Sequence, residues 1–176
     1  MHRRIAELLD YLRRQNGVLR AAYDEVPSQR RLARPAPERW SAAEVVHHVM
    51  LVDRSVARLL RRLSDEARAL PRETDSAPVV PTLDLARIID RAKRQSASEA
   101  AQPKNTDANT LWPDFDATVG ELEDVIAGAD GLAMGAVSAP HPALGTFSGY
   151  EWIAFTGAHA ARHAAQIREI VRPVPV

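Results

Sequence analysis

Trp40-Ser41-Ala42-Ala43-Glu44-Val45 opens one helix of this chain, and Phe147-Ser148-Gly149-Tyr150-Glu151-Trp152 opens another in the same way. In each stretch a serine stands three residues before a glutamate. This is the reciprocal pattern in which the two side chains bond the free backbone N–H groups at a helix start. A large apolar residue precedes each serine and another follows each glutamate, which fixes how the chain enters the helix. The two stretches predict helix starts at Ser41 and Ser148.

Apolar residues at helical spacing extend this reading over the rest of the chain. They predict helices over 5–26, 41–63, 85–92, 115–128 and 148–171, with a proline-rich linker over 64–81 and a loop over 96–109. No segment alternates apolar and polar residues for long enough to predict a β-sheet. Four long amphipathic helices and one short one favour an all-α fold, an antiparallel four-helix bundle with an additional short helix. The 176 residues are expected to form a single domain, 1–176.

Composition excludes several classes of function. The chain has no cysteine, so it cannot form a disulfide, a thiolate metal site or a cysteine nucleophile. Its formal net charge is zero, so no overall field would attract nucleic acid or an anionic membrane. No apolar leader stands at the start, and no run of roughly eighteen apolar residues occurs. We expect a cytoplasmic protein that binds neither nucleic acid nor membrane.

Histidine is the residue type that suggests chemistry. In the helix over 41–63 the stripe of Val45 and Val49 puts His48 beside the apolar face and His47 on the outer face. In the last helix, His159 and His163 both lie on the inward stripe, one turn apart, with Cβ atoms about 5–6 Å from each other. That separation allows two imidazole rings to bind one ion.

Two interpretations of the histidines stay open at this point. They could be buried neutral rings bonded to backbone carbonyl groups, or they could be ligands of one metal ion. Three imidazoles would suit zinc, nickel, cobalt, iron or copper, and would leave coordination positions open, as catalytic sites do. A helical zinc-protease motif is disfavoured, because Ala160 stands where that motif needs a glutamate base.

A family resemblance favours the metal. The segment 34–49 (RPAPERWSAAEVVHHV) resembles the region around the first metal histidine of the DinB-like (YfiT-like) superfamily. So do His141-Pro142-Ala143-Leu144-Gly145 and the stretch from Glu151 through 159–167 (HAARHAAQI), while 64–110 matches only loosely. The resemblance implies a four-helix bundle, commonly a homodimer, in which His48, His159 and His163 hold a divalent metal ion, zinc or nickel. It also makes Arg162 and Gln166 candidates to orient a metal ligand, and Gln166 is the better placed of the two, since it lies one turn after His163.

The resemblance also frames the function. Members of the superfamily include a mycothiol-dependent maleylpyruvate isomerase and bacillithiol S-transferases, and many members are described only as metal-dependent hydrolases. The leading hypothesis is a metal-dependent enzyme that joins a low-molecular-weight thiol to a small electrophilic substrate. The alternatives are hydrolysis by metal-bound water, and a non-catalytic bundle that the metal only stabilises. Trp40 and Trp152 are interpreted as core, His141 as a surface turn residue and Glu44 as a helix cap.

Overall fold

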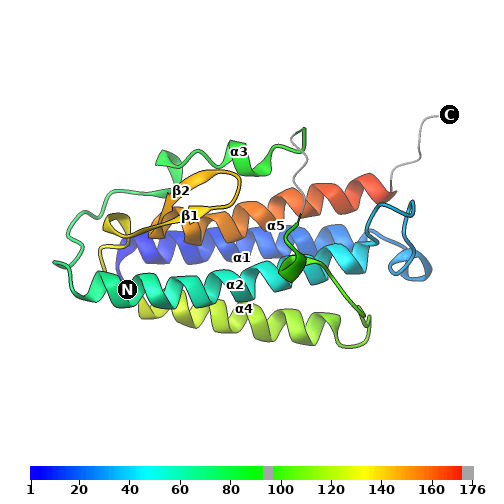
Figure 1. Ribbon diagram of the computed structural model, residues 1–176, viewed down its shortest axis with the longest axis horizontal. Helices are drawn as coiled ribbons and strands as arrows, with labels where there is room; N and C mark the ends of the chain where they lie inside the picture. Colours follow the sequence, from blue (N-terminus) through cyan, green and yellow to red (C-terminus); the bar gives the residue numbers. More distant parts are fainter. Residues whose placement is uncertain (93–96, 172–176) are drawn as a thin grey trace.

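Four long helices lie side by side in the computed structural model, which describes residues 1–92 and 97–171 (Figure 1). They are α1 (Arg3–Asp24), α2 (Ala42–Arg68), α4 (Leu111–Gly128) and α5 (Gly149–Val171). A short helix, α3 (Ala86–Ile89), and a 3₁₀ turn, η3 (Glu99–Ala101), lie in the connection between α2 and α4. The all-α four-helix bundle with an additional short helix is confirmed.

The directions of the helices differ in part from the expected antiparallel order. Figure 1 shows α1 and α5 running one way, and α2 and α4 running the other. Neighbours α2 and α5 are therefore antiparallel as expected, but α1 is parallel to α5 and α2 is parallel to α4. The reason is the long connection 69–110, which returns along the bundle before α4 begins. Four residues of that connection, 93–96, lie outside the described residues.

Both predicted helix starts form as the sequence pattern indicates. The backbone N–H of Ser41 donates to Glu44 Oε2 at 2.8 Å, and the N–H of Glu44 donates to Ser41 Oγ at 3.2 Å. At the second start the corresponding distances between Ser148 and Glu151 are 2.8 and 3.3 Å. Each pair of serine and glutamate thus satisfies two backbone N–H groups that a helix leaves free at its start. The C-terminal ends of the helices were less well predicted. The second helix was expected to end at residue 63, but α2 continues to Arg68.

A β-hairpin corrects the expectation that the chain has no sheet. Strand β1 (Ser138–His141) pairs antiparallel with β2 (Gly145–Ser148) just before α5. Each strand has four residues, too few for a visible alternation. Gly145 has a φ of +86°, which a side chain would disfavour, and so allows the tight turn. The indole N–H of Trp152 donates to the Ala139 carbonyl at 3.1 Å and fixes the hairpin on α5.

The apolar core forms two clusters along the length of the bundle. One contains Leu12 of α1 and Leu60 of α2, and the other contains Leu19 and Val49 of the same two helices. Within the described ranges, no helix combines the length and hydropathy that crossing a bilayer requires. The cytoplasmic location and the single-domain organisation stay predictions.

Candidate metal centre

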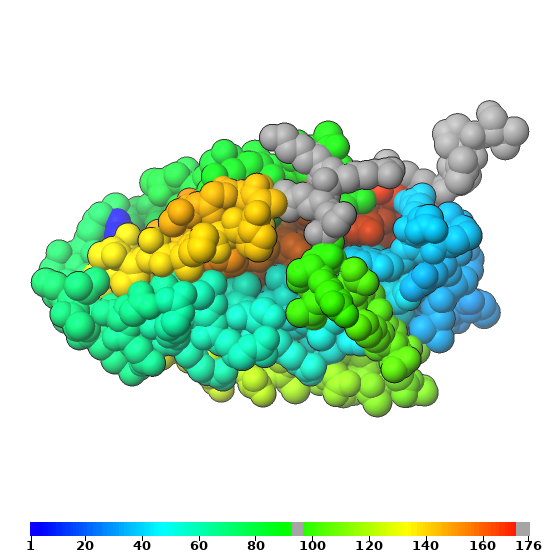
Figure 2. Space-filling model, viewed as in Figure 1, coloured from blue at the N-terminus to red at the C-terminus, as the bar shows by residue number. Residues whose placement is uncertain are grey.

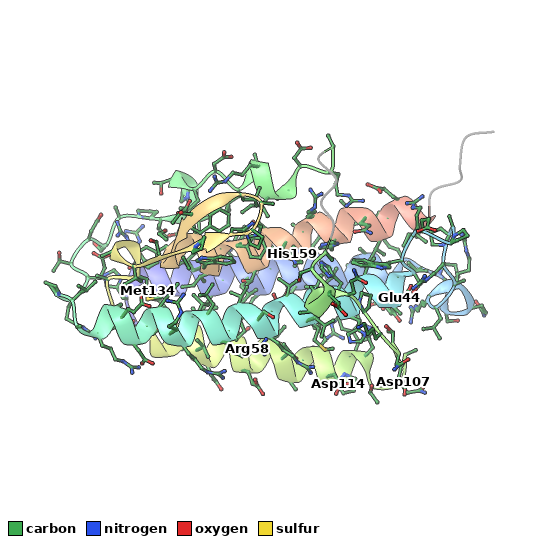
Figure 3. All side chains as sticks on the ribbon, viewed as in Figure 1. Glu44, Arg58, Asp107, Asp114, Met134 and His159 are labelled. Atoms are coloured by element: carbon green, nitrogen blue, oxygen red, sulfur yellow. The ribbon has the colours of Figure 1, made fainter. Side chains whose placement is uncertain are left out.

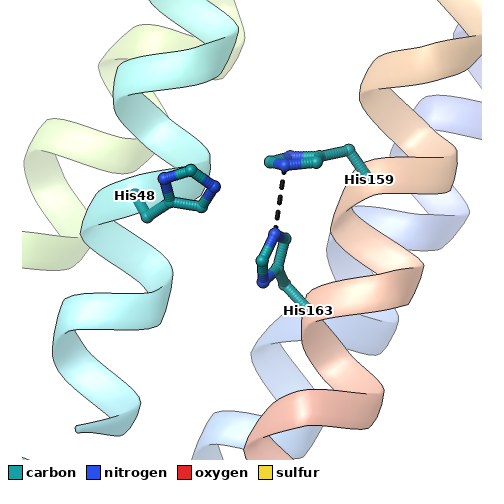
Figure 4. Close-up of side chains that lie close together, drawn as sticks. All are labelled: His48, His159 and His163. Atoms are coloured by element: carbon teal, nitrogen blue, oxygen red, sulfur yellow. Dashed lines mark hydrogen bonds between the residues drawn. The ribbon is translucent and has the colours of Figure 1, made fainter. Parts of the chain in front are cut away.

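Three histidine rings meet where α2 faces α5. His48, His159 and His163 are buried, with 6%, 8% and 6% of their surfaces exposed. Each offers one ring nitrogen, and these three atoms lie within 4.8 Å of one another. His159 Nε2 lies 3.0 Å from His163 Nε2, and the His48 ring faces both from the other helix (Figure 4). The structure thus brings together the three histidines that the sequence singled out, in an arrangement that could hold a metal ion.

Helical phase explains why His48 belongs to this group and His47 does not. His48 lies on the side of α2 that contacts α5, and its ring centre is 5.1 Å from that of His159 and 4.8 Å from that of His163. His47 lies on another face, half-buried, and its Nδ1 is 2.8 Å from Thr106 Oγ1. His47 was expected to be exposed, and it is partly covered because the chain after η3 passes over this face of α2.

Two outer hydrogen bonds determine which ring nitrogens are free. His48 Nδ1 lies 2.7 Å from the Ala101 carbonyl oxygen, and His163 Nδ1 lies 2.7 Å from Gln166 Oε1. Because a carbonyl oxygen only accepts, Nδ1 of each ring must carry the proton. The lone pair of each neutral ring is then on Nε2, the atom that points to the other rings. This is the arrangement by which outer-shell partners orient metal-binding histidines.

Burial keeps the three rings neutral. It lowers the pKa of His159 and of His163 well below the ordinary value of 6.5, and each ring's pKa is lowered further by a neighbouring imidazole. Burial also lowers the pKa of His48, against a smaller opposing effect of its bond to Ala101. At pH 7 all three rings are uncharged, and the neutral imidazole is the form that binds metal.

The donor set fits a divalent ion. Zinc binds imidazole nitrogen at about 2.0–2.1 Å, so two ligands of a tetrahedral ion lie about 3.4 Å apart. The 3.0 Å between His159 and His163 lies close to that value, and the upper limit of 4.8 Å within the group exceeds it by about 1.4 Å. Small rotations of the rings would therefore place all three around one ion, with a fourth position left open.

The rim of the centre comes from several elements. The Trp40 ring packs 4.8 Å from His48, and Phe155 stacks on His159 at 5.2 Å. Figure 2 shows a strip of α5 recessed between the hairpin and the segment around η3, and Figure 3 places His159 in this part of α5. This part of α5 therefore reaches the face seen in Figure 2, between the hairpin and η3.

His141 and Arg162 contribute less directly than Gln166. His141 Nδ1 accepts the N–H groups of Ala143 and Leu144, each at 3.2 Å, so this half-buried ring holds the hairpin turn. Arg162 donates to the carbonyl oxygens of Ile88 and Asp90 and so fixes the end of α3 on α5. Gln166 bonds a ring of the centre, since its Oε1 lies 2.7 Å from His163 Nδ1.

Sequence reasoning missed Ala101 and Arg91, which both lie in the connection between α2 and α4. Ala101 acts through its backbone carbonyl, which every residue possesses, so no sequence signal could have found it. Arg91 Nη1 lies 3.4 Å from Gln166 Oε1, and its guanidinium also binds Glu169 at 3.0–3.2 Å. It therefore supports the residue that orients His163.

Comparison with known proteins agrees with this geometry. The sequence profile of the DinB superfamily matches residues 11–167, a range that includes all three histidines. The chain belongs to the DinB superfamily. It is 26% identical over 139 residues to the uncharacterized protein YuaE of Bacillus subtilis (strain 168), covering 78% of this chain and 80% of YuaE.

A solved structure shows the same fold. The crystal structure of TT2238, described as a four-helix bundle protein, superposes with a TM-score of 0.64. The match covers 94% of this chain and 98% of TT2238 at 21% sequence identity. At that identity the likeness speaks for the fold alone, so the function of this superfamily member has to be argued from its own site.

Proposed function

We propose that this chain is a metal-dependent enzyme that joins a low-molecular-weight thiol to an electrophilic small molecule. His48, His159 and His163 would hold the divalent ion, zinc or nickel, through Nε2. One observation carries the proposal: all three candidate ligands are neutral, buried imidazoles whose ring nitrogens lie within 4.8 Å of one another. As the superfamily resemblance implies, we further propose that two copies of the chain form a homodimer.

The charge around the centre favours an anionic guest. Arg162 lowers the pKa of both His159 and His163, and Arg91 lowers that of His163. Neutral ligands leave the full charge of a divalent ion uncompensated, and these guanidinium groups add to it. A thiolate is an anion with a soft donor atom that suits zinc and nickel. The chain has no cysteine of its own to compete for the open position.

When bound, a divalent ion supplies a Lewis acid that lowers the pKa of a thiol beside it, so that the proton leaves to solvent at neutral pH. The sulfur lone pair then forms a bond to the electrophilic carbon, and the electron pair of the broken bond leaves with the departing group. The protein holds the rings of His48 and His163 in fixed tautomers through Ala101 and Gln166, and limits water through Trp40 and Phe155.

The test is an activity screen of zinc- and nickel-loaded protein with several small thiols and a chromogenic electrophile. We expect turnover that requires metal and thiol and that disappears in His159→Ala. His48→Ala should lose metal, and the matched variant His47→Ala should keep it, because only His48 faces the centre.

Other outcomes would point elsewhere. Ester or amide cleavage without thiol, rising with pH, would support a hydrolase instead. If metal raises the melting temperature but no turnover is found with any thiol or ester, the ion serves only to tie α2 to α5.

A further inference from the structure

The ring of His141 lies next to the metal centre without belonging to it. Its centre is 5.4 Å from that of the Trp152 ring and 5.1 Å from that of the Phe155 ring. Phe155 in turn stacks on His159, with 5.2 Å between the ring centres. A single phenyl ring therefore separates His141 from a candidate metal ligand. Figure 3 shows the hairpin reaching along α5 to the part of the helix that carries His159.

The electrostatics agree with this placement. Burial is the main cause of the lowered pKa of His159, and His141 is among the neighbouring groups that lower this pKa further. The pKa of His141 is itself lowered, first by burial and then by the nearby charge of Arg87. At pH 7 the His141 ring is therefore neutral, with one N–H group and one lone pair.

Two backbone hydrogen bonds determine which nitrogen of His141 carries the proton. The N–H groups of Ala143 and Leu144 both donate to Nδ1, each at 3.2 Å. Because a backbone N–H only donates, Nδ1 must hold the lone pair, and the proton is on Nε2. This tautomer is the opposite of the one that His48 and His163 adopt, whose protons are on Nδ1.

The Nε2–H group of His141 is a hydrogen-bond donor that the fold does not use. Within residues 1–92 and 97–171 it has no acceptor, since the hydrogen bonds of this ring are the two at Nδ1. Nε2 is also not one of the buried atoms that lack a partner, so it is open to solvent. A molecule that enters beside the hairpin can therefore accept this hydrogen bond.

We infer that His141 binds the electrophilic substrate, and that its Nε2–H donates a hydrogen bond to a carbonyl or nitro oxygen of that molecule. The inference rests on the proposed function, because it assigns a role in the same thiol transfer. When the sulfur lone pair forms its bond to carbon, negative charge moves onto this oxygen before the electron pair leaves with the departing group. A donor held in place for such developing charge lowers the barrier, and the proton stays on Nε2 throughout.

Two replacements of His141 separate the donor from the turn. The Oδ1 atom of asparagine stands where Nδ1 of histidine does, and asparagine commonly accepts backbone N–H groups two residues on in turns. His141→Asn therefore keeps the turn and removes the donor. The amide N–H of glutamine reaches the position of Nε2, so His141→Gln keeps a donor and removes the acceptor of the turn. Both variants lose the ring, which makes each the matched control of the other.

The zinc-loaded proteins are assayed with the most active thiol of the screen and two electrophiles. Chlorodinitrobenzene carries nitro oxygens that take up charge, whereas benzyl chloride has no oxygen, and both release chloride. We expect His141→Asn to lower kcat/KM about 10- to 100-fold with chlorodinitrobenzene and to leave the turnover of benzyl chloride nearly unchanged.

His141→Gln should show the reverse pattern. It should retain most of the activity with chlorodinitrobenzene and melt about 1–6 °C below the wild type, because the turn loses its acceptor. Zinc affinity, measured by competition with a chromogenic chelator, should be the same in both variants and the wild type. Nitrogen-15 NMR spectra of the metal-free wild type should show His141 with its proton on Nε2.

An unchanged rate of His141→Asn, or equal losses with the two electrophiles, would overturn the inference and leave the proposed function intact. If His141→Asn does not fold, a proton on Nδ1 of His141 in the NMR spectra would overturn the inference equally. A wild-type chain without any thiol-dependent turnover would refute the proposed function, and the inference with it.

Discussion

Replacing Gln166 should change metal affinity in a direction set by the replacement. Gln166 Oε1 lies 2.7 Å from His163 Nδ1 and keeps the proton of that ring away from the centre. Methionine matches glutamine in length and flexibility but cannot accept this bond, so Gln166→Met frees the ring to rotate and to change tautomer. Loss of such an outer partner typically weakens metal binding about 10- to 100-fold, or roughly 1.4–2.7 kcal/mol.

Gln166→Glu should act in the opposite direction. A carboxylate is a stronger acceptor than an amide, and a hydrogen bond to a charged group contributes roughly 1.5–3 kcal/mol against about 1 for a neutral one. Arg91, 3.4 Å from the same oxygen, would compensate the added charge. We therefore expect Gln166→Glu to bind zinc about 2- to 30-fold more tightly than the wild type.

Competition with a chromogenic chelator at pH 7 measures both changes in one titration format. Gln15→Met on α1 is the control for a glutamine-to-methionine change away from the centre. The reasoning fails if Gln166→Met binds zinc as tightly as the wild type, because the bond at 2.7 Å would then have no part in orienting His163. It fails also if Gln166→Glu binds more weakly.

Three further predictions concern pH and stability. Burial lowers the pKa of all three histidines, so protons compete with the metal for these rings only in more acid solution than usual. Elemental analysis after dialysis should therefore show half-release of zinc below about pH 6 rather than near 6.5. Gly149→Ala should lower the melting temperature by about 2–12 °C, since its Cβ would lie 2.7 Å from the Met134 carbonyl oxygen. Gly17→Ala, with no atom within 4 Å, should raise it by about 1–4 °C; calorimetry that finds the same sign for both would contradict the packing. Trp152→Phe leaves the buried Ala139 carbonyl unpaired and should cost about 1–3 kcal/mol in urea unfolding, whereas an unchanged midpoint would mean that this bond does not hold the hairpin.

Much of the site was predictable because it depends on short-range order. His159 and His163 are one turn apart on a helix whose start is determined by Ser148 and Glu151, and these relations hold within a few residues. The phase of α2, set by its valine stripe, distinguished His48 from His47 for the same reason. The partial covering of His47 by Thr106 was not predictable, because Thr106 lies in a loop that carries no periodic pattern.

The hairpin and the helix directions were missed for a related physical reason. Two strands of four residues are held by pairing with each other and by the bond between Trp152 and Ala139, rather than by an internal pattern. The parallel course of α2 and α4 depends on where the connection 69–110 lies on the bundle. Packing of a segment on distant residues leaves no regular mark in the segment itself.

The amino-acid sequence alone determined that this chain forms a helical bundle, where two of its helices begin, and which three imidazole rings face inward, because those properties follow from capping and from the 3.6-residue period. Only the tertiary structure decided that Ala101 and Gln166 fix the tautomers of His48 and His163, and that the ring of His48 stands opposite that of His159. A backbone carbonyl and the relative level of two antiparallel helices result from contacts across the whole chain, and no local pattern encodes them.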